Sequence, residues 1–252
     1  MSGALSLLSV FAVSLVSLVG LLTLSADEAR LRRLATVLMS FAVGALLGDS
    51  FIHLIPEIFS AGPPTLGPSL LVLGGMLLFF VVEKLLRHHH GTLHAHHHDH
   101  EAGRPELAAI NLLGDAVHNF IDGMLIAASY LSSPTLGVAT TAAVLLHEIP
   151  QEFGDFGVLI HSGLGVRKAL LLNLGSASVS ILGAAVTLAL GAVAGSAITA
   201  ALLPVAAGGF VYIAAADLIP ELQRDRSFRA LVQQAGLIGA GIVVMSLLTL
   251  VG

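Results

Sequence analysis

Long apolar stretches separated by short polar connections run along the whole chain, and this pattern predicts membrane-spanning helices. A spanning helix needs about 20 largely apolar residues, because the hydrocarbon core of a bilayer is roughly 30 Å thick. Eight segments meet this requirement, and they lack the alternation of polar and apolar residues typical of a spanning strand. They are residues 4–24, 34–59, 68–86, 106–131, 134–160, 169–194, 196–222 and 228–251. We therefore expect an all-α membrane protein with eight transmembrane helices in a single domain, residues 1–252.

Composition agrees with this pattern and excludes several other classes of protein. Hydrophobic residues make up 56% of the chain and charged residues 11%, whereas a soluble domain usually carries about 25% charge. The chain has 11 Lys and Arg against 16 Asp and Glu, so it offers no basic surface for a nucleic acid. Because cysteine is absent, disulfide frameworks, zinc ribbons, Fe–S clusters and thiol nucleophiles are excluded.

The positive charges predict which side of the membrane each connection faces. All 11 Lys and Arg lie in, or within three residues of, the connections between helices one and two, three and four, five and six, or seven and eight. Cytoplasmic loops carry an excess of Lys and Arg, so these connections are expected in the cytoplasm and both termini outside. We expect a multi-pass protein of the cell membrane. No positive stretch precedes the first apolar segment, which favours a spanning helix over a cleaved signal peptide.

A histidine-rich tract at residues 88–104 is expected to be a disordered cytoplasmic loop, because so polar a segment cannot bury enough surface to fold. It contains eight of the 12 histidines: His88, His89, His90, His94, His96, His97, His98 and His100. Such a tract binds metals readily, and both a regulatory role and simple metal sequestration are open for it.

Carboxylates and imidazoles are frequent inside the predicted spans. An ionisable side chain in a spanning helix costs about 2.5–3.5 kcal/mol on insertion scales, so it usually faces the bundle interior and has a function. On the fourth helix Asp115, His118, Asn119 and Asp122 follow an i, i+3, i+4, i+7 spacing, which places them on one face. The fifth helix carries a second cluster near its middle: His147, Glu148, Gln151, Glu152 and Asp155.

These two clusters predict a site for a divalent metal ion. Two histidines and two acids at one depth, His118, Asp122, His147 and Glu148, would be costly to bury without a cation. Imidazole, carboxylate and amide groups without thiolates suit zinc and other borderline or harder divalent ions. For Asn173 and the serines of the sixth helix, hydrogen bonds between helices are the expected role.

A short motif occurs twice and predicts inverted repeats. The sequence HLIPE closes the second helix at 53–57, and DLIPE closes the seventh at 217–221. The predicted topology runs these helices in opposite directions, as in secondary transporters whose opposed repeats enclose a midplane site. We expect helices one to three and six to eight to be inverted repeats with helices four and five between them, a 3+2+3 arrangement.

The same motifs resemble a known family. HNFIDG at 118–123 and HEIPQEFGDF at 147–156 are similar to the signature pair of the ZIP (Zrt-, Irt-like) divalent metal transporters, in the branch with HEIPHE-type fifth helices. GDSFIHLIPE at 48–57, AAADLIPEL at 214–222 and the His-rich loop also match. The resemblance covers all eight helices. It implies uptake of zinc or a related divalent ion into the cytoplasm, as cargo and not as a cofactor, and frequent dimers.

The resemblance also implies roles for individual residues. One central metal site would use His118, Asp122, His147 and Gln151, and an adjacent site would use Asn119, Asp122 and Glu148, with Asp122 bridging. On the outer side His53 and Asp49 would meet the metal, and an exit pathway would be lined by Asp115, Glu152 and Asp155. Gln151 stands where that branch usually has a second histidine, and an amide is a weaker ligand, so affinity or metal preference is expected to differ.

Several alternatives remain open. A metal exporter or a metal channel would use the same site and differ in direction or mechanism, and iron, manganese, cobalt and cadmium suit the ligands as zinc does. An intramembrane zinc metalloprotease is disfavoured, because HEIPQ at 147–151 lacks the second histidine of H-E-x-x-H and contains a proline. We expect no enzyme. Glycines of helices six and eight fit packing faces either within one chain or in a homodimer.

Overall fold

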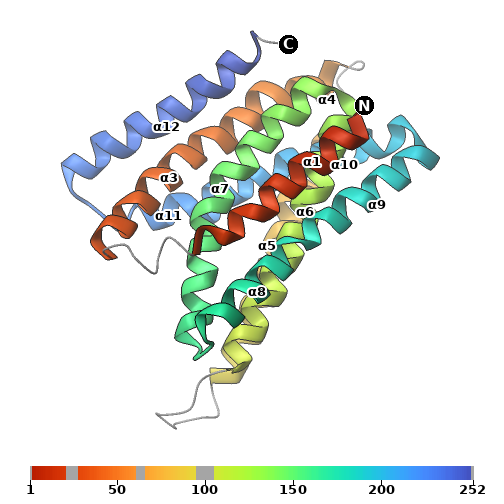
Figure 1. Cartoon of the computed structure of the whole chain (residues 1–252). Coiled ribbons are helices and arrows are strands. Elements are labelled where there is room, and N and C mark those ends of the chain that lie inside the picture. Colours follow the sequence, from red (N-terminus) through yellow and green to blue (C-terminus); the bar gives the residue numbers. More distant parts are fainter. Residues whose placement is uncertain (1, 21–27, 61–65, 95–104, 251–252) are drawn as a thin grey trace.

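A computed structural model describes residues 2–20, 28–60, 66–94 and 105–250, and every regular element in this part of the chain is helical (Figure 1). In chain order the elements are α1 (Ser2–Ser14), η1 (Leu15–Val19), α3 (Glu28–Gly48), η2 (Asp49–Leu54), α4 (Ile55–Ser60), α5 (Leu66–His94), α6 (Pro105–Ser132), α7 (Pro134–His161), α8 (Val166–Ala177), α9 (Val179–Ala194), α10 (Ser196–Tyr212), η3 (Ile213–Leu218), α11 (Ile219–Leu222) and α12 (Phe228–Leu248). The prediction of an all-α protein is confirmed.

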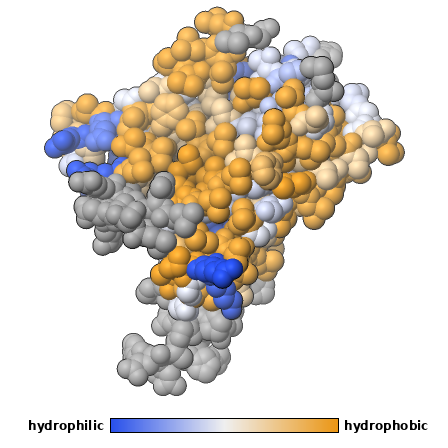
Figure 2. Space-filling model, in the orientation of Figure 1, coloured by the Kyte–Doolittle hydropathy of each residue, from blue (hydrophilic) through white to orange (hydrophobic). Residues whose placement is uncertain are grey.

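Six stretches of the described chain are long and apolar enough to cross a membrane: Ser2–Val19, Arg33–Ser60, Leu66–Leu85, Val166–Ala194, Ser196–Leu222 and Phe228–Leu248. Helices α6 and α7 have 28 residues each and are also long enough, but the clustered acids and histidines make them less apolar. Large apolar side chains cover much of the visible surface, as expected for a protein surrounded by lipid (Figure 2). The chain is thus a multi-pass membrane protein.

Two pairs of helices make close backbone contacts through glycine. Helix α3 packs on α12, and a Cβ added at Gly44 would lie 2.0 Å from the carbonyl oxygen of Ile238. Helix α10 packs on α5, where a Cβ added at Gly208 would lie equally close, 2.0 Å, to the carbonyl oxygen of Val72. Small residues at such interfaces let membrane helices approach closely. Gly44 precedes η2 by the same number of residues as Gly208 precedes η3, so the two contacts occupy matching places.

The predicted second and seventh helices are each interrupted by a wider turn. Both η2 and η3 are six-residue π-helices, and each is followed directly by an Ile-Pro-Glu sequence, at 55–57 and 219–221. Proline lacks an N–H and clashes with the carbonyl four residues earlier, so it favours such a local rearrangement. Single π turns of this kind are frequent at functional sites. The two copies of the sequence motif therefore share an unusual backbone conformation.

Other boundaries differ from the sequence prediction in informative ways. The predicted sixth helix is divided at Ser178 into α8 and α9. Helix α5 continues to His94, because extending an existing helix costs little, and disorder of the tract at 88–104 stays a prediction. His88, His89, His90 and His94 are thus helical in backbone. The remaining predicted loop ligands, His96, His97, His98 and His100, lie outside the described residues.

Two of the glycines of the predicted sixth and eighth helices pack closely within the chain. A Cβ at Gly241 would lie 2.4 Å from the carbonyl oxygen of Phe41, and one at Gly191 would lie 2.7 Å from the side chain of Leu131. Gly195, Gly236 and Gly239 face open space, with nothing within 4 Å. A homodimer therefore stays a prediction, and Gly195, Gly236 and Gly239 are the suggested glycines left for it.

Candidate metal centre

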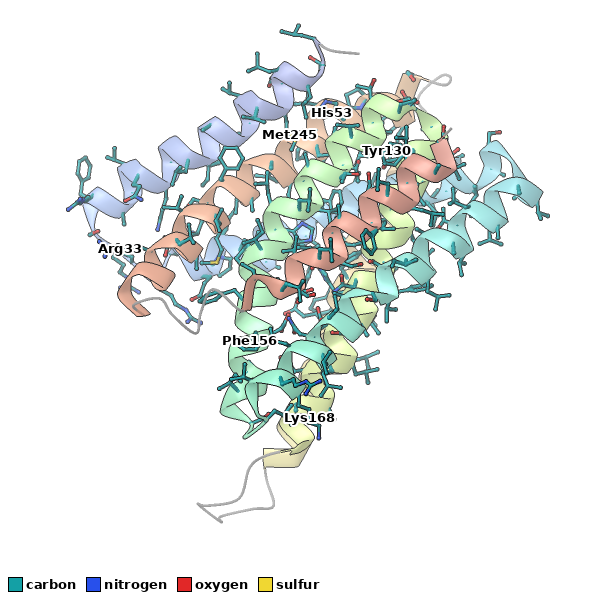
Figure 3. All side chains as sticks on the ribbon, in the orientation of Figure 1. Arg33, His53, Tyr130, Phe156, Lys168 and Met245 are labelled. Atoms are coloured by element: carbon teal, nitrogen blue, oxygen red, sulfur yellow. The ribbon has the colours of Figure 1, made fainter. Side chains whose placement is uncertain are left out.

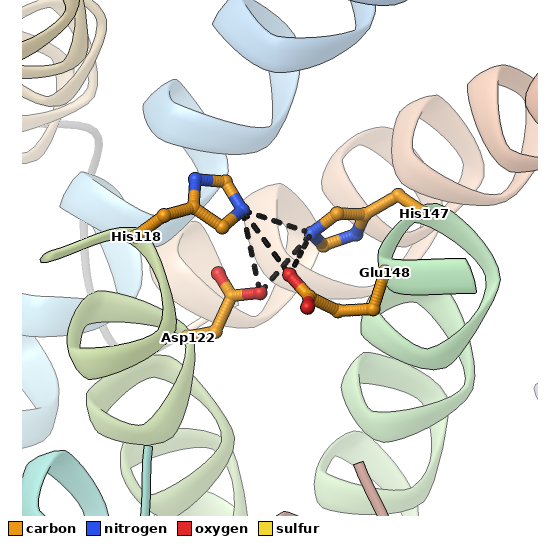
Figure 4. A group of neighbouring side chains, drawn as sticks. All are labelled: His118, Asp122, His147 and Glu148. Carbon is orange, nitrogen blue, oxygen red and sulfur yellow. Dashed lines mark hydrogen bonds and ion pairs between the residues drawn. The ribbon is translucent and has the colours of Figure 1, made fainter. Parts of the chain in front are cut away.

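Four side chains of the types that bind metals meet between α6 and α7 in the interior of the bundle (Figure 4). Helix α6 supplies His118 and Asp122, which are one turn apart, and α7 supplies the neighbours His147 and Glu148. One ligand atom from each of the four lies within 4.8 Å of all the others. The four side chains come together because they lie at one depth on two adjacent helices.

The closest atoms of the cluster are the histidine Nε2 nitrogens and one oxygen from each carboxylate. Nε2 of His147 lies 3.0 Å from Oδ2 of Asp122, 3.6 Å from Oε1 of Glu148 and 3.3 Å from Nε2 of His118. Nε2 of His118 lies 3.7 Å from Asp122 Oδ2 and 3.4 Å from Glu148 Oε1. All four groups therefore point at one small volume.

The ring of His147 is held from two sides. Its Nδ1 lies 3.2 Å from the carbonyl oxygen of Ala143, one turn earlier on α7, and an N–H at Nδ1 would leave Nε2 with a lone pair facing the cluster. The buried Phe210 of α10 packs edge-on against the same ring, with 6.2 Å between the ring centroids. These contacts orient the imidazole before any ligand arrives.

Burial makes this cluster electrostatically expensive on its own. The side chains of Asp122, His147 and Glu148 are fully buried, and that of His118 is 16% exposed. Oδ1 of Asp122 has no hydrogen-bond partner in the described part of the chain. Buried carboxylates are costly unless cations neutralise them, so the arrangement favours a positively charged occupant.

Comparison with known proteins identifies the family. The ZIP Zinc transporter family matches residues 2–107 and 88–249. The chain is 36% identical to Zinc transporter ZIP13 of Pongo abelii over 84% of its own length and 66% of that protein. It is 35% identical to human Zinc transporter ZIP13 over 90% of its own length and 74% of that protein. It is 45% identical to human Zinc transporter ZIP4 over 54% of its own length and 21% of that protein. This chain belongs to the ZIP zinc transporter family.

Family membership also bears on the alternatives. The matched relatives are transporters and not enzymes, which agrees with the prediction that this ZIP chain is not a protease. The chain spans about two thirds of the orangutan ZIP13 and a fifth of human ZIP4, so those relatives contain further sequence.

Two predicted exit residues of the ZIP chain are bound to α8. Asp115 accepts hydrogen bonds from Asn119 Nδ2 at 2.8 Å and from Ser176 Oγ at 2.5 Å. Glu152 accepts one from Asn173 Nδ2 at 2.6 Å. Asn119 thus donates to Asp115 of its own helix and does not belong to the four-residue cluster. The expected hydrogen-bonding role of Asn173 and Ser176 is confirmed.

The two residues expected on the outer side, Asp49 and His53, form a separate pair. Nδ1 of His53 lies 3.4 Å from Asp49 Oδ1, and Thr140 of α7 donates a hydrogen bond to Asp49 Oδ2 at 3.0 Å. Both residues are buried in η2. Gln151 and Asp155 are half-buried on α7, and Oδ2 of Asp155 has no hydrogen-bond partner among described residues. None of these four residues joins the central cluster.

Sequence reasoning missed Thr140 and Phe210. A threonine or a phenylalanine in an apolar span is ordinary, and only the packing of η2 and α10 against α7 reveals that they touch Asp49 and His147. The hydrogen-bonding role of Asn173, in contrast, was predicted from the sequence, since an amide within an apolar helix needs a partner.

Replacing Asn173 with alanine is expected to lower the free energy of unfolding by about 1–3 kcal/mol, because Glu152 would keep a buried oxygen without its donor. Thermal unfolding in detergent measures this. Ser178→Ala is the matched control, since that hydroxyl bonds to Leu174 of its own helix turn. Equal losses in the two variants would show that the bond to Glu152 has no special role.

Proposed function

We propose that this protein transports divalent metal ions across the membrane, zinc foremost, and that His118, Asp122, His147 and Glu148 bind the ion in transit. The spacing of the ligand atoms carries this proposal. Zinc binds nitrogen and oxygen at about 2.0–2.2 Å, and a tetrahedron with such bonds has edges of roughly 3.3–3.6 Å. The five separations that involve a histidine Nε2 run from 3.0 to 3.7 Å, and all four ligand atoms lie within 4.8 Å of one another. An ion would fit with little movement of the side chains.

The ligand chemistry points the same way. Two neutral imidazoles and two carboxylates without thiolate suit zinc, and they also accept iron, manganese, cobalt and cadmium. The ion would neutralise the charges of Asp122 and Glu148, and this would offset the cost of burying the two carboxylates. Gln151 and Asn119, the amides carried over from the family resemblance, would act beside the cluster and not as its main ligands.

The remaining acids suggest a pathway through the bundle. Asp49 and His53 lie on η2 toward one end, where Figure 3 labels His53, and would receive the ion from outside. Asp115, Glu152 and Asp155 would pass it toward the other end, where Lys168 is labelled. Hydrogen bonds from Thr140, Ser176 and Asn173 hold three of these acids in place. The His-rich loop, residues 88–104, would bind metal at the cytoplasmic end.

We further propose eight spans in a 3+2+3 arrangement, with both termini outside the cell membrane. Helices α6 and α7 would be the two central spans, each with a polar face turned inward. The matched glycine contacts of α3 with α12 and of α10 with α5 support inverted repeats, as do the twin π-helices. Such repeats allow a central site to open to either side in turn.

Zinc flux into liposomes containing the purified protein tests this function. We expect saturable uptake, which a simple channel would not show, and competition by the other divalent ions. Counterflow under an imposed pH gradient distinguishes import from export. A protein that binds zinc tightly but moves none in either direction would overturn the proposal.

A further inference from the structure

Glu57 is a charged residue that the metal pathway proposed above does not use. It lies on α4, at the end of the second predicted span, and its side chain is exposed. No other carboxylate, lysine or arginine lies within eight residues of the connections predicted on the outer side, at 60–67, 132–133 and residue 195. In the described part of the chain Glu57 forms no ion pair. A single negative charge therefore lies at this end of the bundle.

In the second copy of the repeated motif, the corresponding glutamate has a cationic partner. Glu221 of α11 pairs with Arg224, with 3.0 Å between Oε2 of the glutamate and Nη2 of the arginine. Glu57 instead accepts a hydrogen bond at Oε1 from Oγ of Ser132, the last residue of α6, at 2.6 Å. A neutral hydroxyl fixes the position of a carboxylate without compensating its charge. Of the two glutamates, Glu57 is thus the one whose charge is left to attract a cation.

Stabilisation of α4 does not account for the charge of Glu57. A carboxylate in the first turn of a helix is stabilised by the free backbone N–H groups of the helix N-terminus. Helix α4 follows η2 without a break, and the N–H of Ile55 already donates to the carbonyl oxygen of Ser50. The first turn of α4 is therefore not a free helix terminus, and the carboxylate gains little from lying there.

Glu57 begins a series of polar side chains that leads from the surface into the bundle. His53, labelled in Figure 3, is four residues earlier and 8% exposed, and Asp49 is four residues earlier again and fully buried. Neither ring nitrogen of His53 has a hydrogen-bond partner among the described residues, although Nδ1 lies 3.4 Å from Asp49 Oδ1. Thr140, which donates to Asp49, precedes His147 of the metal centre by seven residues, roughly 10 Å along α7. Exposure thus falls from Glu57 to Asp49, in the direction of the metal centre.

We propose that Glu57 is the first residue to bind the incoming divalent ion and that Ser132 positions its carboxylate for this step. The inference rests on the transport function proposed above. An exposed carboxylate would hold an ion that keeps most of its water, and His53, about one turn deeper, would then replace a water with an imidazole nitrogen. The attraction of such a charge raises the rate at which a cation reaches a site, and salt screens that attraction.

Zinc uptake from the external medium by cells that produce the full chain tests this role. We expect Glu57→Gln to raise the KM for zinc about fivefold or more and to change the maximal rate by less than about twofold, because the metal centre is intact. Ser132→Ala should raise the KM by a smaller factor, add nothing in the Glu57→Gln background, and differ from Ser132→Thr, which keeps the hydroxyl and the wild-type KM. The matched control is Glu221→Gln, which removes the same charge from the other copy of the motif and should leave the KM unchanged.

Ionic strength separates ion capture from a structural role of Glu57. The ratio of the KM values of Glu57→Gln and the wild type should shrink as ionic strength rises from about 0.01 to 0.15 M at constant osmotic pressure, because the Debye length falls from about 30 to 8 Å. A lower maximal rate at unchanged KM, a KM ratio that salt does not reduce, or equal effects of Glu57→Gln and Glu221→Gln would each overturn the proposal. Absence of uptake by the wild type would contradict the transport function itself, and this inference with it, whereas the comparison of variants concerns Glu57 alone.

Discussion

Alanine in place of His147 is expected to reduce zinc uptake into liposomes by more than about 100-fold, since changes in the residues that merely orient a ligand already cost 10–100-fold in metal affinity. Its Nε2 lies within 3.7 Å of the ligand atoms of all three partners. Without the His147 ring, the ion would keep three of its four ligands, and two of these are buried carboxylates.

Equilibrium zinc binding to the purified variant separates loss of the site from loss of movement, and we expect both to fail. Asp122→Asn, which preserves the shape of the side chain, should fail in the same way because it removes a negative charge. Thr141→Val is the matched control on α7, since that hydroxyl bonds only to Gly137 of its own helix among its described contacts. Uptake by His147→Ala at the wild-type rate would show that the cluster is not the transport site.

Much of this site follows from the sequence because helical periodicity fixes which residues share a face. His118 and Asp122 are one turn apart, and His147 and Glu148 are neighbours at the same depth, so two adjacent helices suffice to assemble the cluster. The cost of burying charge in a membrane then requires these groups to face inward. That reasoning needs no knowledge of how the other helices pack.

Features that depend on a third helix were not predictable in this way. The contacts of Thr140 with Asp49 and of Phe210 with His147 join segments far apart in the chain. Asn119 has the spacing of a ligand but donates to Asp115, because a carboxylate one turn away is a nearer acceptor. The π-helices η2 and η3 also gave no signal in hydropathy, although proline marks both.

The glycine contacts lead to the second large effect, on stability. Gly75→Ala on α5 is expected to lower the midpoint of thermal unfolding in detergent by about 6–12 °C, corresponding to about 3 kcal/mol of overpacking. A Cβ there would lie 2.3 Å from the backbone oxygen of Val205, so α5 and α10 must separate. The neighbouring Gly74 has nothing within 4 Å, and Gly74→Ala should leave the midpoint unchanged or raise it, because alanine favours a helix.

The same comparison tests the proposed repeats. Gly241 of α12 approaches the carbonyl of Phe41 as closely as Gly75 approaches that of Val205, while Gly239 faces open space as Gly74 does. Inverted repeats predict that Gly241→Ala and Gly75→Ala destabilise by similar amounts and that Gly239→Ala is harmless. If only one of the two helix pairs responded, the glycine contacts would be local packing details and would not support a repeated architecture.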